Sequence, residues 1–195
     1  KSAGLESVEV SLQAPGEHNV RNALATLAIV DVLGLSREQA AKALSKFTGT
    51  GRRFDLRGEA NGVSVFDDYA HHPTEIKATL AGARARYPER RIWAVWQPHT
   101  YSRTQALYLE FSRAFKDADE VIVTEVYAAR EPKQEFTSAE IVSGMPHPSA
   151  RYLATLPQVT DYLLKNLHPN DVLIVLSAGD ADQICADVLK ALKER

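Results

Sequence analysis

The sequence predicts an α/β fold: a doubly wound, mostly parallel sheet of about six strands, with an antiparallel N-terminal hairpin and a short helical piece of another domain before it. Three observations predict this. Short β-branched or aromatic runs alternate with helical periodicity from residue 63 onward. Asn61-Gly62, the strongest short hairpin signal, separates two strand-like runs. The run at 172–176 is apolar throughout, as in a central parallel strand that is covered on both faces.

The chain begins with an alternating segment, 8–12, that predicts a short half-buried strand. An apolar face that recurs from His18 predicts a helix that ends before Gly34. The first residues carry neither an initiator Met nor the apolar core of a signal peptide, so we expect a cut inside a longer protein.

A second helix is predicted from a capping box made by Ser36 and Gln39, with its apolar positions running to Phe47. Two helices and one strand bury too little apolar surface to fold alone. We therefore expect residues 1–48 to be an incomplete part of another domain and Gly49-Thr50-Gly51 to be a boundary.

The second part of the chain opens with the predicted hairpin, whose strands are 54–56 and 63–66. A helix should follow from Pro73, which suits a first helical turn, to Pro88, which ends it. Further strand-like runs, each followed by a predicted helix, occur at 92–96, 121–123, 152–153 and 172–176. One of these helices should carry Leu107, Phe111 and Phe115, and another should open with the capping box of Thr137 and Glu140.

Composition excludes several classes of protein. A net charge of −2 over 195 residues gives no electrostatic case for nucleic acid or an anionic membrane. No apolar run approaches the roughly 20 residues of a membrane helix. Cys185, the single cysteine, lies in a helical pattern beside Ile184, so we expect it to be packed, and its lack of a partner fits a reducing compartment.

The segment DDYAHHPTE at 67–75 is the main candidate site, because two carboxylates and two imidazoles follow one strand and precede one helix. Open α/β sheets bind ligands at such positions. The alternative is that Asp68 is a helix cap and that His71 and His72 are solvated loop residues. Four titratable groups within six positions favour a site.

Other polar segments follow the remaining strands, and the carboxyl ends of parallel strands meet at one edge of a sheet. These segments are 97–104, 124–131 and 177–180. Arg103, just inside a helix start, could pair with a carboxylate or phosphate, and His99 lies beside it. The simpler alternative is an exposed helix arginine and a turn histidine.

Asn19 and Asn22 form a further candidate, because asparagine is a poor helix former and capping explains at most one of the two. Three motifs are missing from these 195 residues: a phosphate-binding G-x-x-x-x-G-K-[ST] loop, a G-x-S-x-G nucleophile elbow and an H-E-x-x-H zinc pattern. We therefore assign no metal ligand.

Three motifs, in this order, resemble those of the Mur ligases: GEHNVRNALA at 16–25, DDYAHHPTE at 67–75 and QPHTYSRT at 97–104. GRRF at 51–54 is similar to the segment that opens the family's C-terminal domain. The His-His-Pro form together with Q-P-H-x-Y-S-R-T is typical of the members that add L-alanine to UDP-N-acetylmuramate. Ser177 stands where the family usually has Gly, and Thr100 where some members have Arg.

This resemblance implies three domains, of which residues 1–48 would end the central ATPase domain and 49–195 would form the C-terminal domain that closes over the site. The phosphate-binding loop and the main Mg²⁺ ligands would then lie upstream. His18, Asn19 and Asn22 match positions at the adenine of ATP. Arg53 matches a phosphate contact and Asp68 a ribose contact. The positions on the L-alanine and acyl-phosphate side match Tyr69, His71, His99 and Arg103.

The resemblance further implies ATP-dependent ligation of L-alanine to UDP-N-acetylmuramate through an acyl phosphate, in the cytoplasm, for peptidoglycan synthesis. The partners would be the two substrates, ATP and the missing domains, with no nucleic acid or membrane. Two other functions remain open from the residues: a metal-dependent phosphoesterase built on Asp67, Asp68, His71 and His72, and a non-catalytic nucleotide-binding module. Metal titration would separate the first of these from the ligase.

Overall fold

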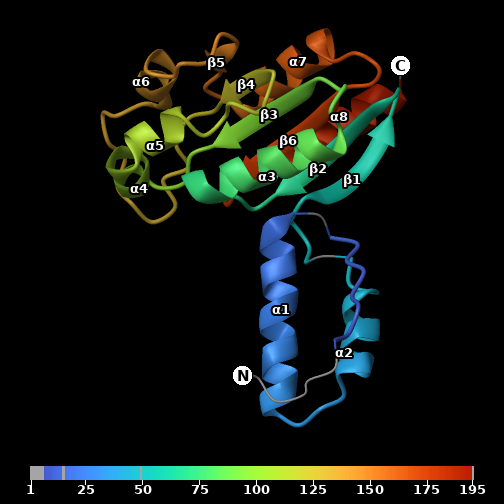
Figure 1. Ribbon diagram of the computed structural model, residues 1–195. Helices are drawn as coiled ribbons and strands as arrows, with labels where there is room; N and C mark the ends of the chain where they lie inside the picture. The colour runs from blue at the N-terminus through green and yellow to red at the C-terminus, as the bar shows by residue number, and fades with distance from the viewer. Residues whose placement is uncertain (1–6, 15, 49, 195) are drawn as a thin grey trace. The chain divides into compact units, whose positions relative to one another are not determined.

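The computed structural model describes residues 7–14, 16–48 and 50–194, without the side chain of His18 (Figure 1). These residues form two compact units that divide between residues 50 and 51. The division falls within the glycine-containing stretch where the sequence predicts a boundary. Each unit is described by itself.

The first unit contains α1 (Glu17–Val32) and α2 (Arg37–Leu44). Gly34 follows α1 with a left-handed φ of 65°, which explains why a glycine stands there. The capping box at α2 is only half made: the Ser36 hydroxyl accepts from the Gln39 N–H but donates to Glu38. Phe47 lies beyond the end of α2, so the expected helix is too long.

The strand expected at 8–12 is wrong, because residues 7–12 form no regular secondary structure and belong to no sheet. A strand needs the backbone hydrogen bonds of a neighbour, and the described part of the first unit holds no other strand. The apolar face of α1 is largely exposed, with Leu24 62% and Val32 87% accessible.

The second unit contains the sheet, and its six strands match the number and the places that the sequence predicts. They are β1 (Asp55–Ala60), β2 (Val63–Asp68), β3 (Ile92–Gln97), β4 (Glu120–Val123), β5 (Ala150–Tyr152) and β6 (Val172–Ser177). Their order is β1-β2-β6-β3-β4-β5, and only the β1–β2 pair is antiparallel. The apolar run of β6 is therefore central, as expected, and pairs with β2 and β3.

The hairpin turn has the geometry that its sequence predicts. Asn61 and Gly62 both have positive φ, 48° and 76°, as the tight turn between β1 and β2 requires. A bulge in β1 between Leu56 and Gly58 shifts the register of the pair.

Helices cover both faces of the sheet (Figure 1). One face carries α3 (Pro73–Arg86), α5 (Tyr108–Ser112) and α6 (Ser138–Ser143); the other carries α7 (Leu156–Asn166) and α8 (Gln183–Lys193). A single helix carrying Leu107, Phe111 and Phe115 is wrong, because α4 (Tyr101–Ala106) ends at Leu107, where α5 begins. Phe111 and Phe115, which both follow the break, pack on Trp96.

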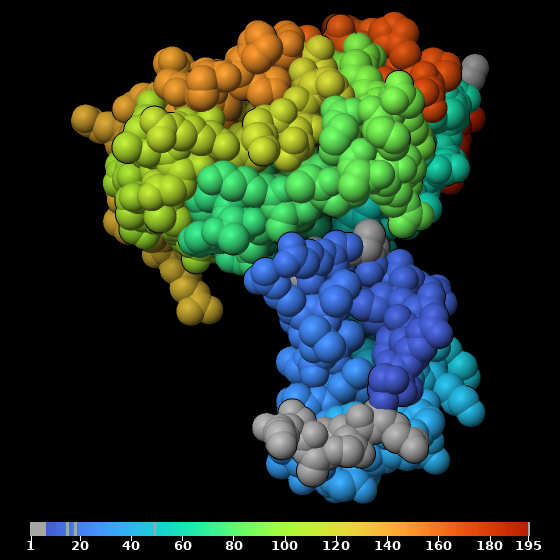
Figure 2. All heavy atoms as spheres, in the orientation of Figure 1, coloured from blue at the N-terminus to red at the C-terminus, as the bar shows by residue number. Residues whose placement is uncertain are grey.

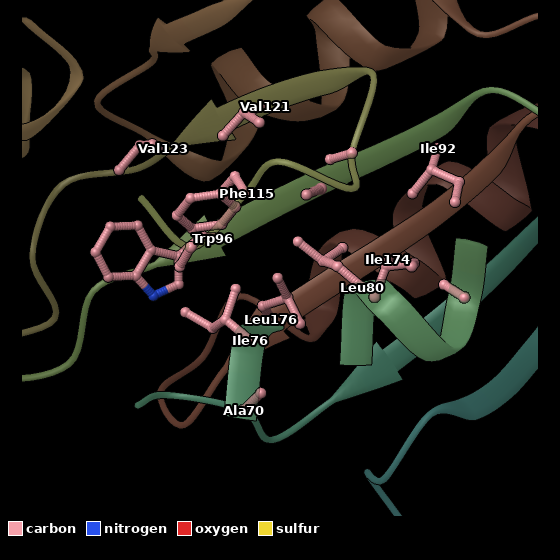
Figure 3. Packing of buried hydrophobic residues seen from close by; sticks show 14 of the residues in the cluster. Ala70, Ile76, Leu80, Ile92, Trp96, Phe115, Val121, Val123, Ile174 and Leu176 are labelled. Atoms are coloured by element: carbon pink, nitrogen blue, oxygen red, sulfur yellow. The ribbon is translucent and has the colours of Figure 1, made fainter. Parts of the chain in front are cut away.

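The core on the α3 face joins strand and helix residues that lie far apart in the sequence. Figure 3 shows Ile76 and Leu80 of α3 beside Ile174 and Leu176 of β6, with Trp96 at one end. Each of these five side chains is fully buried. Cys185 is buried on the opposite face, where burial raises the pKa of its thiol to about 12, so it is packed as expected.

Candidate functional site

The carboxyl ends of β2, β6 and β3 bring three of the predicted polar segments together. β6 lies between β2 and β3, so the segments that follow the outer two strands converge over its end. The ring centroids of His71, which follows β2, and His99, which follows β3, are 6.1 Å apart. The rings of Tyr69 and His71 form a T-shaped pair with centroids 5.2 Å apart. Sequence positions 30 residues apart thus form one cluster.

Arg53 joins this cluster from the segment before β1. Its guanidinium lies 5.7 Å from the centre of the Tyr69 ring and 3.6 Å from a Glu75 carboxylate oxygen. The Arg53 side chain is about half exposed, at 48%, so solvent or a ligand can reach its charge. We call Arg53, Tyr69, His71 and His99 the histidine cluster.

Glu75 organises the start of α3 and was not among the predicted site residues. One carboxylate oxygen accepts from the backbone N–H groups of both His71 and His72, at 3.0 and 3.2 Å. Burial acts to raise the pKa of Glu75, but the hydrogen bond from His71 and the nearby His71 and Arg53 charges outweigh it and lower the pKa. A capping-box search of residues 72–75 would have found Glu75.

His72 caps α3. Its Nδ1 accepts from the Thr74 N–H at 3.3 Å, while Glu75 returns the second half of a capping box. This is close to the simpler interpretation from the sequence, but it applies to His72 rather than to Asp68.

Asp68, the last residue of β2, is buried and 4% accessible. One oxygen accepts from Ala70 N–H at 2.7 Å, and the other from Phe54 N–H at 2.8 Å and the Thr79 hydroxyl at 3.2 Å. Burial raises the pKa of Asp68, and these bonds oppose that rise. A carboxylate has about four acceptor positions, so one remains for a further donor.

Asp67 points to the opposite side of β2, as alternation along a strand requires. It is fully buried and pairs with the Arg52 guanidinium at 2.9 Å. The Arg52 guanidinium also donates to the Ser177 carbonyl at 2.9 Å, and the Arg52 backbone carbonyl accepts from the Tyr69 N–H at 2.8 Å. It therefore fastens the ends of β2 and β6 together. Burial raises the pKa of Asp67, and the hydrogen bond from Arg52 opposes that rise.

The four residues of the alternative, a metal-dependent phosphoesterase, are therefore not gathered as a metal site. Asp67 and Asp68 face opposite sides of the sheet, and His72 is used as a cap. Across the residues that the structure describes, no group of three or more His, Cys, Asp or Glu side chains is arranged to hold a metal ion.

His99 is half-buried and lies between several charged groups. Burial, then the charges of Arg103 and His71, lower its pKa, with the charge of Glu131 acting the other way. Its Nδ1 is enclosed and has no hydrogen-bond partner within the described ranges, and the same holds for Nη1 of Arg103. Both nitrogens are closed to solvent, so a ligand could reach them only after a local rearrangement.

Thr100 gives the segment after β3 an unusual backbone. Its φ is 67°, a left-handed conformation that a β-branched residue rarely adopts and that costs about 1–3 kcal/mol. Thr100 N–H donates to the Tyr127 carbonyl at 2.9 Å, and its own carbonyl accepts from the Thr104 hydroxyl at 2.6 Å. The strained turn starts α4, the helix that carries Arg103.

Glu125 and Tyr127, which follow β4, were predicted only as parts of a polar segment. The Tyr127 ring stacks on His99 with centroids 5.7 Å apart. Glu125 accepts from Val126 and Ser138 N–H groups and from the hydroxyls of Thr137 and Tyr152. The rest of this segment, up to α6, stands out from the surface of the second unit (Figure 2, gold).

His18, Asn19 and Asn22 lie in α1 of the first unit, whereas the histidine cluster belongs to the second unit. Gly16 is the N-cap residue of α1, so neither asparagine occupies the N-cap position. Asn22 is exposed. The assignments of these residues, and of the other predicted site residues, to ligands stay predictions.

Residues 52–179 match the family model described as Mur ligase, glutamate ligase domain. The chain belongs to the Mur ligase family. The matched range holds every residue of the histidine cluster and Arg103.

Relatives of this Mur ligase chain include the UDP-N-acetylmuramate–L-alanine ligase of Acetivibrio thermocellus, 45% identical over 93% of the chain and 39% of the relative. The enzyme of the same name from a Roseiflexus species is 43% identical over 95% and 40%. A solved structure, the UDP-N-acetylmuramate-alanine ligase of Thermotoga maritima, matches with a TM-score of 0.80 and 30% identity over 98% of this chain and 41% of that one. The chain thus spans about two fifths of the length of these relatives.

Proposed function

We propose that this Mur ligase chain is the C-terminal part of an ATP-dependent ligase that joins L-alanine to UDP-N-acetylmuramate in the cytoplasm. Residues 1–48 would end the central ATPase domain, and 49–195 would be the domain that closes over the reactants. The observation that carries the proposal is the 45% identity, over 93% of the chain, to a relative that bears this name. The histidine cluster supports it as a place for the reacting groups.

The acid–amine side of the reaction is assigned to the histidine cluster and Arg103. Ligation activates the substrate carboxylate as an acyl phosphate, which the amine of L-alanine then attacks to release phosphate. His71 and His99 lie 6.1 Å apart and can bind the acyl phosphate or accept a proton from the amine. Tyr69 packs against His71 and holds its ring, and Arg103 is suited to the carboxylate of L-alanine.

The ATP side is assigned to residues in both units. Arg53 is half exposed, and its 3.6 Å contact with Glu75 is loose enough for a phosphate to compete for its charge. Asp68 would use its remaining acceptor position for a ribose hydroxyl. His18, Asn19 and Asn22 would contact adenine, by resemblance alone.

The half-exposed charge of Arg53 therefore fits a phosphate of ATP. The described residues offer no group of three or more His, Cys, Asp or Glu side chains for Mg²⁺, which would be bound mainly by residues upstream of this chain. When bound, Mg²⁺ would neutralise phosphate charge during transfer. The residues of this chain would position the reactants and exclude water, which can supply several kcal/mol of the barrier reduction.

The complete protein that contains this chain should release phosphate from ATP only when UDP-N-acetylmuramate and L-alanine are both present. Chain 1–195 alone should release none, because it contains no phosphate-binding loop motif. Phosphate release by the complete protein without L-alanine, or with another amino acid in preference to it, would contradict the proposal. Ligase activity of the 195-residue chain by itself would contradict the assignment of roles between domains.

A further inference from the structure

We infer that Tyr127 is a positioning residue for His99 and that the backbone of Gly179 supports the Tyr127 ring. The importance of His99 rests on the proposed function, whereas the contacts that hold it do not. The inference joins three strands of the sheet, because His99 follows β3, Tyr127 follows β4 and Gly179 follows β6.

The backbone that follows β3 is joined to the backbone that follows β4. His99 and Tyr127 form an isolated parallel bridge beyond the named strands. Tyr127 N–H donates to the Pro98 carbonyl at 2.8 Å, and Thr100 N–H donates to the Tyr127 carbonyl at 2.9 Å. These two bonds place the Tyr127 side chain beside His99 and set the register of the pair.

The rings of Tyr127 and His99 stack on each other. The two rings are 24° from parallel, with centroids 5.7 Å apart. An aromatic pair of this geometry contributes about 0.5–1.5 kcal/mol beyond the buried area. The Tyr127 ring covers one face of His99 and restricts the orientation of the imidazole.

Gly179 lies against the Tyr127 ring and leaves no space for a side chain of its own. A Cβ at this position would lie 2.7 Å from Cγ of Tyr127 and 2.5 Å from Oε1 of Gln97. Both distances are shorter than real Cβ contacts allow. The Tyr127 ring therefore rests directly against the glycine backbone.

Gln97 prevents the turn after β6 from moving to make room. Its Oε1 accepts from the Ser177 hydroxyl at 2.7 Å and from the N–H groups of Asp180 and Ala181 at 3.1 and 3.2 Å. Its Nε2 donates to the Asp180 carboxylate at 2.8 Å. A side chain at position 179 would therefore press on both the Gln97 amide and the Tyr127 ring. The Gln97 amide is fixed by these bonds, whereas Tyr127 is 37% exposed and its ring has room to move.

Four substitutions in chain 1–195 test the inference. Tyr127→Leu removes the stack, Tyr127→Phe keeps the ring and removes only the hydroxyl, and Gly179→Ala displaces the ring. Gly82→Ala is the matched control, because a Cβ at Gly82 has no heavy atom within 4 Å.

The measurement is an NMR pH titration of the His99 ring, assigned with His99→Gln. Three charged groups also act on His99 from packed elements: His71 before α3, Arg103 on α4 and Glu131 after β4. All three are retained in every variant. Because Tyr127→Leu admits water to the imidazole, we expect the His99 pKa to rise toward its ordinary value and the ring protons to lose their ring-current shift. Gly179→Ala should move both in the same direction, and Tyr127→Phe and Gly82→Ala should leave both unchanged.

An unchanged His99 titration in Tyr127→Leu and Gly179→Ala would overturn the inference, as would a Tyr127→Phe result equal to that of Tyr127→Leu. If Tyr127→Leu does not fold, Gly179→Ala against Gly82→Ala decides. In the complete protein, Gly179→Ala should lower kcat by about tenfold or more, since small misplacement of a reacting group is costly. A normal kcat with the expected NMR changes would contradict the proposed role of His99 and leave the positioning contact intact.

Discussion

Glu125 offers the sharpest test of how the segment after β4 is held. Its carboxylate accepts from Val126 N–H at 2.8 Å and Ser138 N–H at 3.2 Å, and both of these residues are buried. Glu125→Ala leaves the two N–H groups unpaired, at about 1–3 kcal/mol each. We therefore expect the free energy of unfolding of the second unit to fall by about 2–5 kcal/mol.

Glu125→Gln should cost far less, about 1 kcal/mol. Its remaining oxygen can still accept from the two backbone N–H groups. Its new NH₂ group faces the hydroxyls of Thr137 and Tyr152, which can rotate to accept. Glu125→Gln loses only the additional strength that hydrogen bonds to a charged acceptor have over bonds to a neutral one.

The dependence on pH follows from the direction of the Glu125 pKa. Burial acts to raise this pKa, but the hydrogen bonds from Tyr152, Val126 and Thr137 outweigh it and lower the pKa below the usual 4.5. A lowered folded pKa contributes stability that is present above 4.5 and is lost as the pH falls through the folded value. The difference between the natural chain and Glu125→Gln should therefore shrink as the pH falls below 4.5.

Urea unfolding followed by tryptophan fluorescence measures this effect in the second unit alone, because Trp93 and Trp96 both lie on β3. Glu135→Ala, an exposed position in the same segment, is the control and should change the unfolding free energy by no more than about 0.5 kcal/mol. A Glu125→Ala variant as stable as this control would contradict the expected loss of stability. Equal losses for Glu125→Gln and Glu125→Ala would refute the assignment to the two N–H groups.

Two further predictions concern the site and the hairpin. In the complete protein, Arg103→Lys keeps the positive charge but loses the planar guanidinium fork. The apparent affinity for L-alanine should therefore fall more than about tenfold, or 1.4 kcal/mol, while the affinity for ATP changes little. Steady-state kinetics with each substrate varied in turn would measure both affinities. A defect limited to ATP would instead place Arg103 on the phosphates. Gly62→Ala should destabilise the second unit by about 1–2 kcal/mol or more, because φ is 76° and the new Cβ would lie 3.2 Å from Pro169. Gly82→Ala should be neutral or stabilising in the same urea assay, and equal effects of the two substitutions would contradict this account.

The proposed ligase function explains why a domain with no phosphate-binding loop would hold a cluster of basic and aromatic side chains at one edge. Such a domain would not need to bind ATP tightly by itself. It would bring the histidine cluster and Arg103 to reactants that are held elsewhere, and the structural contacts of Glu75, Arg52 and Glu125 would keep these groups in position.

Much of this protein follows from the sequence by itself. Local signals act over a few residues, so Asn61-Gly62 with alternating neighbours specifies the hairpin, and Thr137 with Glu140 specifies the start of α6. The continuous apolar run of β6 specifies a central strand, since only a position covered on both faces favours it. The motif residues Tyr69, His71 and His99 could also be selected, because polar groups that follow parallel strands share one edge.

Which of those polar residues lie in the histidine cluster, and which make structural contacts instead, depends on the tertiary structure. Asp67 and Asp68 are adjacent in sequence, yet the alternation of a strand sends them to opposite faces, one to Arg52 and the other to backbone N–H groups. The strand expected at 8–12 lacks a partner within the described residues, and pairing is a non-local property. The contact between Tyr127 and Gly179 joins residues 52 positions apart, so no local sequence pattern could reveal this contact. The contact depends on the order in which β6, β3 and β4 lie in the sheet.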